Sequence, residues 1–118
     1  MIRLDGMPSE HARCALLDEV SRLESLAADL TRFAGGCPPS PAELASAPTL
    51  RFWRLVTHGG PHLVGICRGH PRLRLPLITT STVWAMDEGA GWARTLSRVY
   101  ALGEPAGHPG RWEAIHRG

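Results

Sequence analysis

Apolar residues in the first third of the chain recur at spacings of four and three, with charged and small polar residues between them. Such spacing gathers the apolar side chains on one face of an amphipathic helix. We therefore predict a helix over residues 9–34. One face of it would cover a sheet, although the same spacing is also a heptad pattern that could pair with a partner helix. The series consists of Leu16, Val20, Leu23, Ala27 and Leu30, with Leu26 and Phe33 beside it.

Capping signals bound this helix and predict a second, shorter one. Ser9 is suited to cap the first helix, and Gly35-Gly36 would end it. Ser40 is followed by Pro41 and, three positions on, by Glu43. A capping serine, a proline at the first helical position and a glutamate at the third predict a helix over residues 41–46.

The chain then changes to segments rich in Val, Ile, Thr and Trp, with turn residues between them. This composition predicts strands near residues 51–57, 62–68 and 77–86. Two prolines in the connection between the second and third strands are incompatible with a central strand there. Residues 103–118 read as an irregular tail, with a short turn that Trp112 and Ile115 could anchor.

The stretch WARTLSRVYALG, residues 92–103, fits two structures. Its periodicity favours a helix ended by Gly103. Its context favours a strand over residues 92–102, because the loop DEGAG would form a hairpin with the preceding strand. In either structure residues four apart share a face, so Arg94 and Arg98 are expected to point the same way.

These elements predict a single α+β domain spanning residues 1–118. In this fold the long N-terminal helix packs on a small, mostly antiparallel sheet of about four strands within the β-rich region 51–102. A chain of this length can bury a core without disulfides, and its three cysteines form no paired spacing. No stretch reaches the ~18 consecutive apolar residues of a membrane span. We expect a cytoplasmic protein without a membrane partner.

All thirteen basic residues are arginines, and the formal net charge is +2 with a pI of about 8.7. This charge is lower than a dedicated nucleic-acid-binding domain carries. Codon bias in a GC-rich genome is one explanation for the absence of lysine, and each guanidinium is still suited to bind a carboxylate or phosphate. Several arginines in the second half of the chain are interleaved along the sequence with Trp84, Trp92 and Tyr100. The candidate partner- or nucleic-acid-binding residues are Arg68, Arg72, Arg74, Arg94, Ser97 and Arg98.

The sequence favours neither a metal site nor a catalytic site. His58 with His62 and Cys67 with His70 have spacings seen in zinc sites, but a strand separates the pairs by about 16 Å. Ser81 lacks the G-x-S-x-G elbow of a hydrolase nucleophile. We therefore expect no metal, no cofactor and no enzymatic activity.

Several segments resemble a small bacterial family of unknown function, which is sometimes associated with phage or other mobile elements. The similarity covers residues 40–107. It is carried by SPAELASAP and by the pattern G-H-P … T-S … W-A-R-T-x-S-R-x-Y-x-L-G. The resemblance implies a bacterial or phage setting and leaves open a role as an inhibitor or regulator of a host defence complex.

Taken together, these features predict a non-enzymatic protein-binding module. Its arginine and aromatic surface would engage an acidic protein surface or a host protein complex. The alternative is a weak, salt-sensitive nucleic-acid-binding protein that uses the same surface. A third possibility is that the arginines are ordinary solvated surface residues. Dimerisation through the 9–34 helix is also open.

Overall fold

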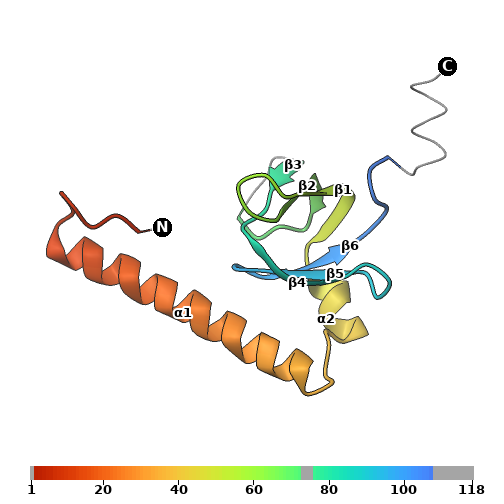
Figure 1. Ribbon diagram of the computed structural model, residues 1–118, viewed down its shortest axis with the longest axis horizontal. Helices are drawn as coiled ribbons and strands as arrows, with labels where there is room; N and C mark the ends of the chain where they lie inside the picture. Colours follow the sequence, from red (N-terminus) through yellow and green to blue (C-terminus); the bar gives the residue numbers. More distant parts are fainter. Residues whose placement is uncertain (1, 73–75, 108–118) are drawn as a thin grey trace.

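The computed structural model describes residues 2–72 and 76–107 and joins two helices to one six-stranded sheet (Figure 1). The α+β class is confirmed, but the sheet has six strands rather than about four. It is also mixed, because β1 and β6 pair in parallel while the other neighbouring strands are antiparallel. The elements are α1 (Ser9–Ala34), α2 (Pro41–Ser46), β1 (Thr49–Val56), β2 (His62–Arg68), β3 (Leu77–Thr79), β4 (Val83–Asp87), β5 (Trp92–Thr95) and β6 (Val99–Leu102).

The sheet curls into a small barrel because both of its edges belong to one bent segment. The strand order is β3-β2-β1-β6-β5-β4, and β3 and β4 are separated only by residues 80–82. The prediction of one strand over 77–86 is therefore wrong: the segment pairs first with β2 and then, after the bend, with β5. At the bend the Thr80 hydroxyl accepts a hydrogen bond from the Leu63 backbone at 2.9 Å. Local composition carries no signal for such a bend.

Strand β1 carries a bulge beside the barrel core. The pairing of β1 with β2 shifts between Arg51 and Arg54, and Phe52 at the bulge has a φ of 51°. A Cβ atom on Gly65 would lie 3.0 Å from the Arg51 carbonyl oxygen and from the Trp53 Cα, so only glycine fits opposite the bulge. The buried core residues of the barrel are Leu50, Trp53, Leu63, Ile78, Ala93 and Tyr100.

The 92–102 stretch is neither a helix nor one continuous strand. It forms the hairpin of β5 and β6, and the Thr95 hydroxyl closes the turn by accepting hydrogen bonds from the Ser97 and Arg98 amides at 3.2 and 3.3 Å. The strand interpretation thus gives the correct type of secondary structure, but the stretch contains two strands rather than one. Because the turn interrupts the period of two, Arg94 lies in a strand and Arg98 in the turn, and the expected common face does not exist.

Both helices have the predicted bounds. The capping box of α2 is present, with the Ser40 hydroxyl accepting from the Glu43 amide at 3.1 Å. The predicted cap of α1 is wrong, because Ser9 is the first helical residue and Pro8 precedes it without a side-chain cap.

Contrary to the prediction, helix α1 does not lie along the barrel. It projects beyond it, and only its C-terminal part meets the strands (Figure 1). There Leu26 is buried and the ring of Phe33 packs on that of Trp92, with 4.9 Å between centroids. Over the described ranges, neither helix has the length and apolar character needed to cross a bilayer.

The tail is described only as far as residue 107, so the predicted turn around Trp112 and Ile115 lies outside the described residues. Its first part follows β1: the Phe52 amide bonds to the Glu104 carbonyl, and the Ala106 amide to the Trp53 carbonyl.

Candidate functional site

Arg94, one of the predicted surface residues, lies inside the protein. Its side chain is 2 % exposed and forms an ion pair with Asp29, with 2.9 Å between Nε and Oδ2. Nη1 donates to the Thr95 carbonyl at 2.9 Å, and Nη2 donates to the Ser25 hydroxyl at 3.3 Å. The expectation that Arg94 contacts a partner is therefore wrong. This arginine ties β5 to α1.

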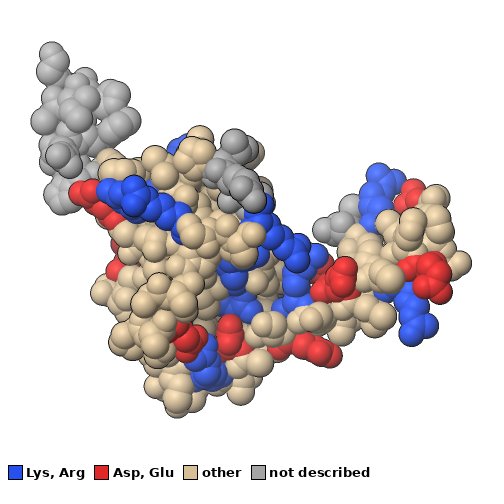
Figure 2. Space-filling model, turned by 180° about the vertical axis from the view of Figure 1, so that it is seen from behind, with Lys and Arg blue, Asp and Glu red and all other residues tan. Residues whose placement is uncertain are grey.

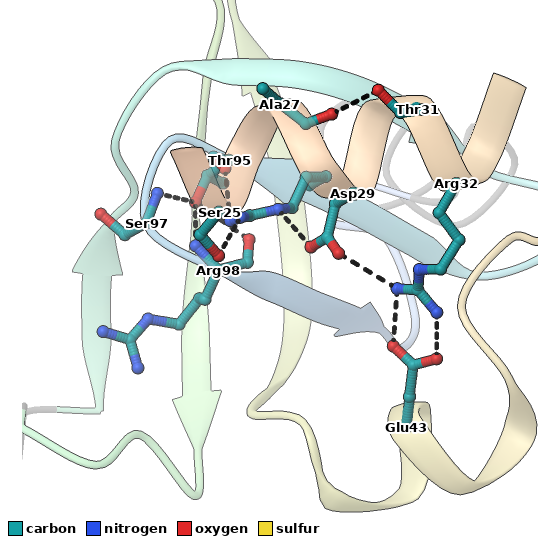
Figure 3. Close-up of polar contacts among 10 residues, drawn as sticks. Ser25, Ala27, Asp29, Thr31, Arg32, Glu43, Thr95, Ser97 and Arg98 are labelled. Carbon is teal, nitrogen blue, oxygen red and sulfur yellow. Dashed lines mark hydrogen bonds and ion pairs between the residues drawn. The ribbon is translucent and has the colours of Figure 1, made fainter. Parts of the chain in front are cut away.

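The same ion pair begins a polar network that joins both helices to the barrel (Figure 3). Asp29 also contacts Arg32 at 3.3 Å, and Arg32 grips both carboxylate oxygens of Glu43 in α2. The hydrogen bond from Arg32 lowers the pKa of the Glu43 carboxyl, while Glu43 raises the pKa of Arg32. The Arg98 guanidinium points away from this network (Figure 3).

A pocket with a volume of about 230 Å³ opens beside Arg98 at the β5–β6 turn. Two guanidinium groups, an imidazole and several hydroxyl groups line it, and none of the described residues that line it carries a carboxylate. The pocket brings together the turns that follow β2, β3 and β5. Its lining residues are His70, Arg72, Thr79, Thr80, Ser81, Ser97, Arg98 and Tyr100.

Hydrogen bonds hold the hydroxyl-bearing wall of the pocket in place. The Ser81 and Ser97 hydroxyl oxygens lie 3.2 Å apart and join the β3–β4 bend to the β5–β6 turn. The Thr80 hydroxyl donates to the Ser81 carbonyl at 2.8 Å. Arg98 is partly buried, and within the described residues its Nε has no hydrogen-bond partner. A ligand would thus meet hydroxyl and guanidinium donors on turns that these hydrogen bonds already hold in place.

His70 and Tyr100 form the other wall. The Nδ1 atom of His70 accepts a hydrogen bond from the Arg72 amide at 3.0 Å, which leaves the proton of the neutral ring on Nε2. Desolvation, and then the positive charges of Arg98 and Arg72, lower the pKa of His70 below its usual 6.5. The Tyr100 ring lies 6.3 Å from the imidazole between centroids, and burial raises the pKa of its hydroxyl.

This arrangement suits the binding of an anion. Guanidinium forks and hydroxyl groups donate hydrogen bonds to carboxylate or phosphate oxygens, and no carboxylate among the described lining residues competes for them. Desolvation is the main cause of the lowered pKa of His70, and the positive charges of Arg98 and Arg72 lower it further. Basic side chains gather between the barrel and the helix, with acidic ones close by (Figure 2).

The predicted site residues have three different positions. Arg72, Ser97 and Arg98 meet in the pocket. Arg68 is exposed at the end of β2 but does not line the pocket, and Arg74 lies outside the described residues.

Other pocket residues are absent from the predicted set. They are His70, Thr79, Thr80, Ser81 and Tyr100. The sequence did contain one signal for the β5–β6 turn. Thr95 lies two residues before Ser97, and a threonine hydroxyl can close a turn by accepting a hydrogen bond from the backbone amide two residues on.

Most of the expected aromatic surface is buried. Trp92 and Tyr100 are 7 % and 3 % exposed, so their ring faces are covered. Trp84 is 56 % exposed and remains accessible.

The chain belongs to DUF6634, a family of unknown function whose model matches residues 14–108. The matched region includes the pocket and most of α1. No curated protein and no solved structure matches the chain significantly.

Proposed function

We propose that this member of a family of unknown function is a non-enzymatic binding module that takes an acidic group of a protein partner into the pocket of Arg72 and Arg98. The observation that carries the proposal is the lining of the pocket, in which every charged side chain among the described residues is basic. A carboxylate entering it can accept hydrogen bonds from both guanidiniums and from the Ser81–Ser97 wall.

Arg98 contributes most in this arrangement. Its side chain is partly buried, so its charge is less screened by solvent than that of the exposed Arg72. A hydrogen bond to a charged group contributes about 1.5–3 kcal/mol. Loss of the Arg98 guanidinium is therefore expected to weaken binding by roughly 10- to 100-fold.

Weak nucleic-acid binding is the second candidate, and the exposed ring of Trp84 favours it. Single-stranded binders combine a basic groove with a series of accessible aromatic faces. Two of the three aromatic residues expected to provide those faces, Trp92 and Tyr100, are buried. The proposal therefore ranks an acidic protein partner first. The phage setting and the inhibition of a host defence complex rest on the sequence resemblance.

Fluorescence anisotropy with a labelled polyglutamate peptide tests the proposal. The wild-type protein should bind the peptide, and Arg98→Ala should lose roughly tenfold or more in affinity. Arg54→Ala is the matched control, because Arg54 is an exposed arginine of β1 outside the pocket. Equal affinities of the Arg98→Ala and Arg54→Ala variants would refute the assignment of the pocket.

A single-stranded DNA oligonucleotide of the same charge separates the two candidates. A nucleic-acid binder should prefer the oligonucleotide and lose affinity steeply between 50 and 200 mM salt. Trp84→Ala should then weaken binding further, because stacking contributes about 1–3 kcal/mol per base. Preference for the peptide with no effect of Trp84→Ala supports the acidic protein partner.

A further inference from the structure

Helix α1 presents an apolar stripe that no described part of the chain covers. The stripe consists of Leu16, Leu17, Val20 and Leu23, whose exposed fractions lie between 43 % and 53 %. At 100° per residue it faces about a third of a turn away from Leu26, the residue that α1 buries against the barrel. The packing face of α1 and the apolar stripe are thus two different faces of one helix.

Charged residues of opposite sign flank the apolar stripe. Arg13 lies one turn before it, and Glu24 directly follows it. Arg22 pairs with Glu19, and Arg32 with Asp29, whereas Arg13 and Glu24 form no ion pair with any described residue. Both lie on the side of the helix that carries the stripe.

We infer that the apolar stripe is the contact surface for a second copy of this chain, with the two α1 helices antiparallel. The distribution of charge decides between the orientations. A parallel pair would bring Arg13 beside the partner's Arg13 and Glu24 beside the partner's Glu24. An antiparallel pair brings Arg13 beside the partner's Glu24, and two-fold symmetry repeats that contact. Leu17 then lies opposite the partner's Val20 at the centre.

The fold leaves room for this contact. The N-terminal part of α1 projects from the barrel, and the barrel contacts the other face of the helix near its C-terminal end (Figure 1). The helix has 26 residues, so it is about 39 Å long. Four half-exposed apolar side chains per chain make a small interface, and small interfaces are weak and concentration-dependent. We expect a dissociation constant on the order of 10 μM.

Sedimentation equilibrium over a concentration series from about 5 to about 500 μM tests the inference. The weight-average mass of the wild-type protein should rise from one chain towards two. Leu17→Glu and Val20→Glu should each keep the protein monomeric throughout, because each places a charge at the centre of the contact. Leu77→Glu controls for loss of an exposed apolar residue, since Leu77 is 64 % exposed and lies in β3.

Charge reversal tests the orientation. Arg13→Glu and Glu24→Arg should each weaken the dimer by about fivefold, and the double variant should restore it. In a parallel dimer neither single change alters the like-charge contacts, so all three variants would match the wild type and refute the antiparallel arrangement. Circular dichroism of each variant checks that helix content is unchanged.

A wild-type protein that stays monomeric up to about 500 μM refutes self-association, and the stripe would then serve a different protein. A dimer that Leu17→Glu leaves intact refutes the assignment of the stripe. The inference is independent of the pocket: Arg98→Ala should dimerise like the wild type.

Discussion

Replacing Asp29 with alanine should destabilise the protein far more than the partial exposure of the Asp29 side chain suggests. The side chain of Asp29 is 25 % exposed, but that of its partner Arg94 is only 2 % exposed. The substitution leaves the Arg94 guanidinium inside the protein with only neutral acceptors, the Thr95 carbonyl and the Ser25 hydroxyl. An uncompensated buried charge is one of the few changes that destabilise a protein severely.

The magnitude follows from the burial of the two partners. Breaking a fully buried ion pair costs about 3–5 kcal/mol, whereas an exposed pair contributes about 0–1 kcal/mol. Because water reaches Asp29 but not Arg94, we expect Asp29→Ala to lower the free energy of unfolding by about 2–4 kcal/mol. Arg94→Met should cost less, about 1–2 kcal/mol, because the remaining carboxylate is partly solvated and still contacts Arg32.

Urea denaturation followed by circular dichroism measures both effects. Asp18→Ala is the control, since Asp18 is an exposed carboxylate of the same helix with no ion pair to any described residue. The control should change stability by less than about 0.5 kcal/mol. Equal free energies of unfolding for Asp29→Ala and Asp18→Ala would refute the role assigned to the buried Arg94 charge. A larger loss of unfolding free energy in Arg94→Met than in Asp29→Ala would also refute it.

Three further changes test other parts of the structure. Gly65→Ala should lower the free energy of unfolding by about 1–3 kcal/mol in urea denaturation, because its Cβ would meet backbone atoms at 3.0 Å, and an unchanged stability would contradict the bulge. Ser40→Ala should cost about 1 kcal/mol by loss of the cap of α2, with the exposed Ser21→Ala as control. Arg98→Ala should raise the pKa of His70 in an NMR titration, since it removes a positive charge that lowers this pKa. The negative charge of an anion in the pocket should favour the protonated imidazole and so raise the pKa of His70. Protonation and anion binding then favour each other, so anion binding should tighten as the pH falls through that pKa.

The elements that sequence patterns predicted correctly are those whose signals are local. The capping box of α2 needs only Ser40, Pro41 and Glu43, and it formed as expected. The bounds of α1 follow from its apolar period and the glycines after it. The bend between β3 and β4 depends instead on closure of the barrel, because its Thr80 hydroxyl bonds to Leu63 across the sheet. A partner distant in sequence leaves no periodic signal.

Arg94 and Arg98 show why the candidate site was only partly predictable. Both are arginines in the same short segment, and they would share a face only if the period of that segment were unbroken. The Thr95 hydroxyl breaks that period by closing a turn between them. One arginine then enters the interior to meet Asp29, a residue 65 positions away in sequence, and the other reaches the pocket. Burial of a charge depends on such a distant partner, and composition cannot identify it.

The β5–β6 hairpin therefore connects the two surfaces for which we propose a function. Arg94 fastens α1 to the barrel on one side of the turn, and Arg98 lines the pocket next to that turn. An antiparallel pair of α1 helices would then hold two pockets at a fixed separation, because the Asp29–Arg94 ion pair limits rotation of each barrel about its helix. Two rigidly linked pockets bind a partner carrying two suitably spaced acidic groups more tightly than either pocket alone. Bivalent binding would then depend on the stability of one buried ion pair, and Asp29→Ala should weaken such binding even where each pocket is intact.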